Sequence, residues 1–143
     1  MRKNCRLLQK LQPAGKIPYI VPGRNRQDKL FSQLYLKQGG KKVYEVVPLD
    51  DNEFGYEWVN TDLGENINCG TWRNQPEKLN EETEALICIG YAVGVLAEIA
   101  YTKWFKPKPV YIIRELVSSK LPEEINKTAS VFSGNSGFEQ PKT

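Results

Sequence analysis

Short apolar segments alternate with segments of helical periodicity along the sequence, and this alternation restricts the fold more than any other feature. Four apolar segments have the length and the content of valine, isoleucine and tyrosine that strands favour. They are residues 16–21, 43–47, 85–90 and 108–116. Short, continuously apolar strands separated by helices are typical of a parallel sheet with helices on both faces. The sequence therefore predicts an α/β fold of this kind.

The segments between the apolar stretches have the patterns of helices. Residues 22–40 predict a loop and an amphipathic helix, in which Leu30, Phe31 and Leu34 repeat at helical spacing and Gly39 and Gly40 end the helix. Further helices are predicted for residues 6–12, 76–84, 94–105 and 121–132.

Two segments have weaker patterns. Pro18 has no N–H to donate to a neighbouring strand, so the first strand is either an edge strand or begins at Tyr19. Residues 50–71 form a polar and aromatic stretch, for which we predict a loop holding a short strand or helix of its own.

The length of 143 residues corresponds to one domain. We expect residues 1–132 to form this single domain. Residues 133–143 (SGNSGFEQPKT) lack the apolar content of a packed segment, and we expect a disordered C-terminal tail.

Composition excludes several classes of function. The 20 basic and 17 acidic residues are spread along the chain without a dense basic stripe, so we expect no nucleic-acid binding. No segment approaches the ~20 apolar residues of a membrane span, so no membrane association is expected. Cys5, Cys69 and Cys88 have no paired spacing, and Cys88 lies in an apolar strand, where a small buried hydrophobe is expected. These features predict a reduced, cytoplasmic protein.

The chain contains no histidine, which removes the commonest general base and the commonest metal ligand together. The cysteines lack C-x-x-C spacing, and no acidic cluster has the spacing of a calcium loop. We therefore expect no metal and assign no cofactor. Any chemistry must rest on carboxylates, arginines, tyrosines and backbone amides.

The most informative candidate site is the stretch GYAVGVLAEIAYTKW, residues 90–104. Ligands of parallel α/β sheets bind at the carboxyl ends of strands, where loops lead into helices. The loop from Gly90 to Gly94 has this position, and so do residues 21–27 and the segment from Leu49 onward. Backbone amides at such a helix start favour an anion, and they also stabilise Glu98 as a carboxylate. Alternatively, the glycines only allow close packing and Glu98 is a solvated charge.

Three blocks of the sequence resemble the Lonely Guy (LOG) family, whose motif is P-G-G-x-G-T-x-x-E with a tryptophan further along the helix. Gly94, Glu98 and Trp104 match the last glycine, the glutamate and the tryptophan of that motif. Residues 17–50 are similar to the family's strand, phosphate loop, helix, Gly-Gly and strand, and residues 72–90 are similar to its arginine-containing segment. Together the blocks cover about two-thirds of the chain.

The resemblance implies a Rossmann-like fold that binds a nucleotide. Enzymes of the family release the base from a nucleoside 5'-monophosphate by hydrolysing its N-glycosidic bond, a reaction class shared with the similar nucleoside deoxyribosyltransferases. By position, Glu98 would act at the sugar and Arg73 would be the second catalytic residue. The ligand-binding residues implied are Gly23, Arg24, Arg26, Gly90, Tyr91, Gly94 and Val95.

The sequence departs from the family where the phosphate would bind. Tyr91 and Ala92 replace adjacent glycines, and Val95 replaces a threonine whose hydroxyl would donate a hydrogen bond. We therefore predict a protein that binds a nucleotide or nucleotide-derived ligand, with lost or weakened catalysis. The alternative is an active phosphoribohydrolase that uses Glu98 and Arg73.

The same residues are compatible with two further hypotheses. The ligand could be pterin-like, as in the molybdenum-cofactor carrier proteins of this fold group, or the chain could be a structural remnant completed by a partner. Arg73 could equally be a surface residue in a salt bridge, and Trp104 is expected in the core because tryptophan at helical spacing usually packs. Family members dimerise through helices beside the active site, so a homo-oligomer is expected by resemblance.

Overall fold

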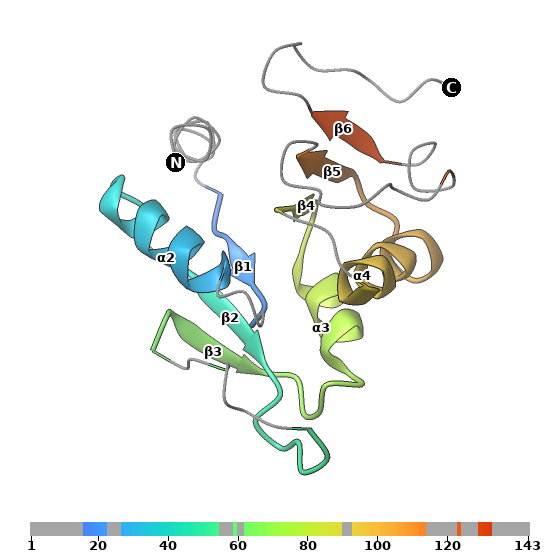
Figure 1. Cartoon of the computed structure of the whole chain (residues 1–143), viewed down its shortest axis with the longest axis horizontal. Coiled ribbons are helices and arrows are strands. Elements are labelled where there is room, and N and C mark those ends of the chain that lie inside the picture. Colours follow the sequence, from blue (N-terminus) through green and yellow to red (C-terminus); the bar gives the residue numbers. More distant parts are fainter. Residues whose placement is uncertain are drawn as a thin grey trace. The chain divides into compact units, whose positions relative to one another are not determined.

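A computed structural model describes residues 16–22, 27–54, 59, 62–89, 93–113, 123 and 129–132 (Figure 1). The helices in these residues are α2 (Gln27–Lys37), α3 (Gln75–Glu82) and α4 (Val93–Trp104). The strands are β1 (Tyr19–Ile20), β2 (Tyr44–Val47), β3 (Glu65–Asn68), β4 (Leu86–Cys88), β5 (Val110–Ile113) and β6 (Ser130–Phe132).

The strands form two parallel sheets of three strands each. One has the order β1-β2-β3, with Tyr19 opposite Tyr44 and Val47 opposite Asn68. The other has the order β4-β5-β6, with Cys88 opposite Ile112. The predicted α/β class with parallel strands is thus confirmed, although the strands are divided between two sheets. A Rossmann-like arrangement stays a prediction.

The chain separates into two compact units, residues 1–79 and 80–143, each with one of the sheets. Each unit has its own apolar core. In the first unit the buried core residues are Ile20, Tyr35, Val43 and Leu63, and Phe31 and Leu34 of α2 pack against them. In the second they are Cys88, Ile99, Val110, Ile112 and Ala129. The predicted burial of Cys88 is therefore confirmed.

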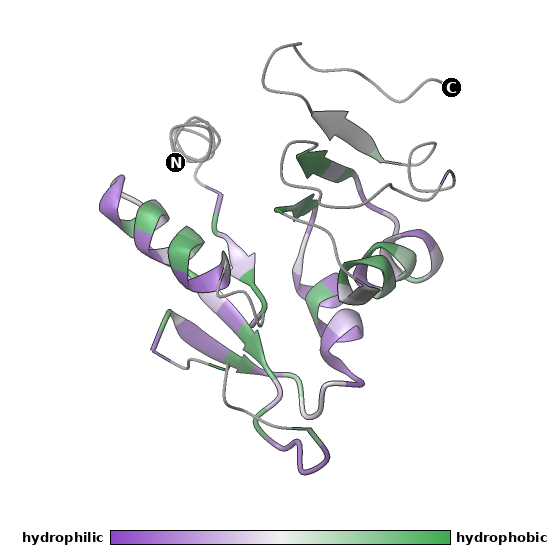
Figure 2. Ribbon diagram, in the orientation of Figure 1, coloured by the Kyte–Doolittle hydropathy of each residue, from purple (hydrophilic) through white to green (hydrophobic). Residues whose placement is uncertain are grey.

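Helix α2 ends as its glycines predict. Gly39 has a φ of 92°, the left-handed conformation that glycine adopts without strain. The N–H of Gly40 donates to the carbonyl of Tyr35, and that of Gly39 donates to Leu36, which together make a Schellman motif. A Cβ at Gly40 would lie 2.2 Å from the Tyr35 ring, so only glycine fits there. In Figure 2 hydrophobic and hydrophilic stretches alternate along α2, as in an amphipathic helix.

Two expectations are wrong. The helix predicted over residues 121–132 does not reach the end of that segment, because Ser130–Phe132 is strand β6, paired in parallel with β5. Backbone hydrogen bonding to β5 outweighs the helical pattern there. Trp104, expected in the core, is 79% exposed at the end of α4 and packs on Phe105 instead (ring centroids 4.8 Å apart).

The structure confirms several of the predicted strands and helices. Strand β1 begins at Tyr19, as Pro18 predicts, and the short strand expected in residues 50–71 is β3. The helices predicted over residues 76–84 and 94–105 are α3 and α4, displaced by one or two residues. The predicted helix at residues 6–12 and the predicted tail at residues 133–143 lie outside the described residues.

Candidate functional site

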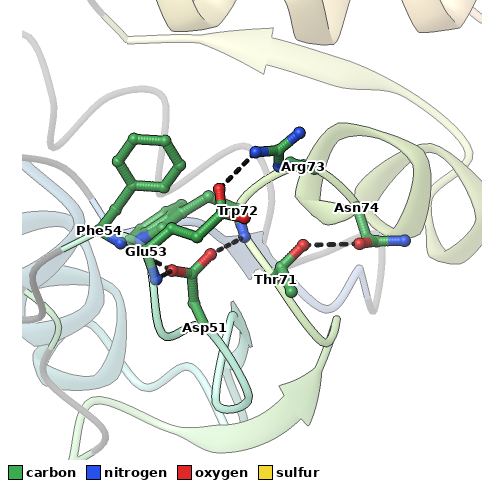
Figure 3. A network of polar contacts seen from close by, with 7 residues as sticks. All are labelled: Asp51, Glu53, Phe54, Thr71, Trp72, Arg73 and Asn74. Atoms are coloured by element: carbon green, nitrogen blue, oxygen red, sulfur yellow. Dashed lines mark hydrogen bonds and ion pairs between the residues drawn. The ribbon is translucent and has the colours of Figure 1, made fainter.

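The loops at the carboxyl ends of β2 and β3 are joined by one buried carboxylate, that of Asp51 (Figure 3). Its Oδ1 accepts hydrogen bonds from the N–H groups of Glu53 and Phe54 at 2.8 and 2.9 Å. Its Oδ2 accepts one from the N–H of Trp72 at 2.9 Å. Asp51 follows β2 and Trp72 follows β3, so this side chain holds two segments that are 21 residues apart in sequence.

The same hydrogen bonds lower the pKa of Asp51. The N–H of Trp72 contributes most, followed by that of Phe54, because each donor stabilises the charged form of the carboxylate. The positive charge of Arg73 acts in the same direction. Asp51 is therefore ionised at neutral pH and serves as a fixed acceptor for backbone amides.

Arg73, the predicted catalytic arginine, directly follows the residue that Asp51 holds. Its guanidinium forms an ion pair with Glu53, and 72% of its side chain is exposed. Figure 3 shows the two charged groups next to each other, above the Asp51 carboxylate. Both segments that carry this pair are fixed by Asp51, so Arg73 is a charged donor on a braced loop. The salt-bridge role considered for Arg73 is also satisfied by this geometry.

A second polar cluster braces the ends of the same two strands. Asn68, the last residue of β3, accepts from the N–H groups of Leu49 and Gly70 at 3.2 and 2.8 Å. Its side-chain amide donates to Asp50 at 2.9 Å. The N–H of Asp50 donates in turn to the carbonyl of Gly70, whose φ is 87°. The carboxyl edge of the first sheet is thus built from short, mutually bonded loops.

In the second unit, Glu98 lies on α4, half-buried. Its negative charge adds to the effect of burial in raising the pKa of Cys88 to about 12, which places it near that thiol. Cys88 is the last residue of β4, so Glu98 belongs to the carboxyl end of that strand. Val95 packs against the core of this unit, and Gly94 is exposed in the first turn of α4, with open space where a Cβ would stand.

The predicted site residues therefore fall into three groups. Arg73 lies in the first unit, whereas Glu98, Gly94 and Val95 lie in the second. The remaining predicted ligand-binding residues, Gly23, Arg24, Arg26, Gly90 and Tyr91, lie outside the described residues.

Sequence reasoning missed two acidic residues. Asp51 looked like one of several charges in a weakly patterned loop, and only the double acid Asp50-Asp51 after the strand signalled it. Glu45 lies in the middle of an apolar strand, VYEVV, and it is fully buried. Its interruption of the apolar run was the available signal.

The two described cysteines are both buried. Burial raises the pKa of Cys69 to about 11 and that of Cys88 to about 12, so both stay protonated thiols. Among the described residues, no group of three or more acids or cysteines is arranged to hold a metal ion. None of the described helices has the length and apolar character needed to cross a lipid bilayer.

Comparisons of the chain with family models, with curated proteins and with solved structures each gave no match.

Proposed function

We propose that the protein binds a nucleotide or nucleotide-derived ligand and that Arg73 contacts an anionic group of that ligand. The observation that carries the proposal is the bracing of Arg73 by Asp51 at the carboxyl ends of β2 and β3. Parallel α/β sheets bind ligands at this edge. An exposed guanidinium on a fixed loop suits a phosphate, because its planar set of donors can make two parallel hydrogen bonds.

Glu53 is compatible with this role. In the structure it pairs with Arg73 at an exposed position, where an ion pair contributes little to stability. A phosphate could therefore take the place of the carboxylate at small cost. The pair also keeps the guanidinium oriented until a ligand arrives.

The test is to measure, by thermal shift and by calorimetry, whether the protein binds any of a panel of nucleoside 5'-mono-, di- and triphosphates. We expect stabilisation by at least one nucleotide, of about 2.7 kcal/mol at a hundred times its dissociation constant. Arg73→Ala should weaken that binding about tenfold or more, since it removes a charge-assisted contact. Lys41→Ala, which removes an exposed cation outside the site, should leave the affinity unchanged.

Two results would count against the proposal. One is the absence of any shift with the whole panel and with pterins. The other is equal affinity of the parent protein and Arg73→Ala, which would leave the arginine with its salt-bridge role alone.

A second candidate is the glycosidase reaction, which the position of Glu98 favours. A half-buried carboxylate at the carboxyl end of β4 could act at the anomeric carbon of a nucleotide. Release of free base from nucleoside 5'-monophosphates, followed by chromatography, tests this activity. Base released by the parent protein and not by Glu98→Gln would support it, whereas binding without release would limit the protein to a binding role.

Self-association is a further proposal, which the exposed aromatic residues at the end of α4 support. Trp104 and Phe105 are 79% and 53% exposed, and Tyr101 stacks on Phe105. Light scattering over a wide concentration range tests it, and a monomer at every concentration would contradict it.

A further inference from the structure

Among the described residues of the first unit, Glu45 is an acid in an unusual place. It lies in β2, the middle strand of its sheet, and none of its surface is exposed. Both carboxylate oxygens are buried and have no hydrogen-bond partner. Burying an ionised carboxylate without a partner costs several kcal/mol of folding free energy. Protonation or a bound cation would remove that cost.

The side of the sheet that Glu45 occupies is the one covered by α2. Glu45 is opposite Ile20 and two residues from Val43, and both of these belong to the core that packs on Tyr35 of α2. In a strand, residues two apart point to the same face. The Glu45 side chain therefore faces an apolar layer between helix and sheet.

The charged group that acts on Glu45 across this layer is another acid. Asp28, in the first turn of α2, is also buried, and its negative charge adds to burial in raising the pKa of Glu45 to about 7. Burial is the larger of the two causes. A neighbouring negative charge disfavours ionisation of a carboxyl group.

No described cation is among the causes of the raised pKa of Glu45. The ammonium of Lys42 binds Glu65 at 2.9 Å and stands over the Tyr44 ring, which is the opposite face of the sheet from Glu45. Strand β1 contributes no charge, and β3 places Asn66 opposite Glu45. On α2, the half-buried Lys29 directly follows Asp28 in sequence, and Lys37 is exposed in the last turn, the far end from Asp28. The raised pKa of Glu45 has burial and Asp28 as its causes, and neither lysine is among them.

We infer that Glu45 is held as the uncharged acid in the folded protein, and that its ionisation sets it against Asp28 and loosens α2 from the sheet. The first unit is thereby a proton-dependent structure. The inference does not depend on the proposed nucleotide binding.

The direction of the pH effect follows from proton linkage. Because the pKa of Glu45 is higher in the folded than in the unfolded chain, its contribution to stability is complete below about pH 4.5 and is lost as pH rises through about 7. Between pH 5 and pH 8.5 the unfolding equilibrium constant of the first unit should rise on the order of 100-fold from this residue alone.

The direct test is a pH titration of the full chain labelled with ¹³C at the glutamate carboxyl groups, with the Glu45 signal assigned by its absence in Glu45→Gln. We expect a midpoint near 7 for Glu45. Asp28→Asn should lower that midpoint without returning it to the ordinary value, since burial remains. A midpoint below about 5 in the parent protein would overturn the inference.

Stability provides the second readout. Urea unfolding and amide exchange of peptides from α2 and β2, corrected for intrinsic exchange rates, are measured from pH 5 to pH 8.5. Glu45→Gln should abolish most of the pH dependence and should be more stable than the parent at pH 8.5. Glu77→Gln, at an exposed position on α3, is the matched control and should follow the parent.

Three outcomes would contradict the inference. The parent could show no loss of stability with rising pH, or Glu45→Gln could keep the parental pH profile. Alternatively, Mg²⁺ or Ca²⁺ at pH 8.5 could stabilise the parent and not Glu45→Gln, which would assign the two acids to a cation instead of a proton.

Discussion

At the scale of single residues, two acids of the first unit have opposite electrostatic environments. Asp51 accepts three backbone N–H groups, which lower its pKa, whereas Glu45 accepts none, and burial raises its pKa. Hydrogen bonds to the charged form and removal from water are the physical causes of this difference. Asp51 therefore acts as a charged brace, and Glu45 acts as a neutral member of the core.

The brace predicts the effect of Asp51→Asn. Asparagine has one oxygen where aspartate has two, and its amide nitrogen cannot accept a hydrogen bond. The variant therefore loses either the hydrogen bond from the Trp72 N–H or the hydrogen bonds from the N–H groups of Glu53 and Phe54. We expect amide protection of residues 71–74 to fall on the order of tenfold at neutral pH. Exchange measured by mass spectrometry checks this, with Glu77→Gln, at an exposed position on α3, as the control.

The lowered pKa of Asp51 determines how its contribution to stability changes with pH. A depressed pKa in the folded state gives stability that is complete above the ordinary value of 3.8 and is lost as pH falls below it. The parent protein should therefore approach the exchange behaviour of Asp51→Asn in acid. Equal protection in both proteins at neutral pH would show that the brace contributes nothing.

At the scale of elements, the end of α3 is tied to the segment before β5 by polar side chains. The Lys108 ammonium is buried and donates to the carbonyls of Asn80 and Thr83, the latter at 2.6 Å. The Asn80 side chain pairs with the backbone of Lys106 through two hydrogen bonds of 3.2 Å. These donors satisfy carbonyls that a helix C-terminus leaves without partners.

Lys108→Met should therefore destabilise the second unit. It keeps the length of the side chain but removes the charge-assisted hydrogen bonds and leaves buried carbonyls without their donor, at a cost of about 1–3 kcal/mol. Urea unfolding checks the loss, with Lys41→Met, at an exposed position of the first unit, as control. If the free energy of unfolding fell no more than in the control, water would be supplying the hydrogen bonds to these carbonyls in place of the ammonium.

At the scale of the whole molecule, each unit has its own sheet and its own core, so damage to one core should be felt mainly in that unit. Val43→Ala in the first core should cost about 1–3 kcal/mol and reduce amide protection chiefly in β1, β2 and β3. Ile112→Ala in the second core should act chiefly on β4 and β5, at about 2–5 kcal/mol. Equal loss of protection in both sheets from either change would show one cooperative unit instead.

Sequence alone predicted much of the secondary structure in the described residues, whereas the site residues that it proposed stay predictions. Apolar runs such as Val43–Val47 and the helical spacing before Gly39 are local signals, because strand and helix have different periods. Glu98 was proposed as a site residue because it follows a glycine-containing loop after an apolar strand. Its charge acts on Cys88, the last residue of β4, but its role stays a prediction.

Only the tertiary structure decided the rest, and the reason is the same in each case. The division into two sheets, the strand β6 and the exposure of Trp104 depend on which segments pair across the chain. The role of Asp51 depends on a hydrogen-bond partner 21 residues away in sequence. The role of Glu45 depends on its carboxylate oxygens having no hydrogen-bond partner. Sequence sets what each residue can bind, whereas folding sets which groups come within reach of it and how much water remains around them.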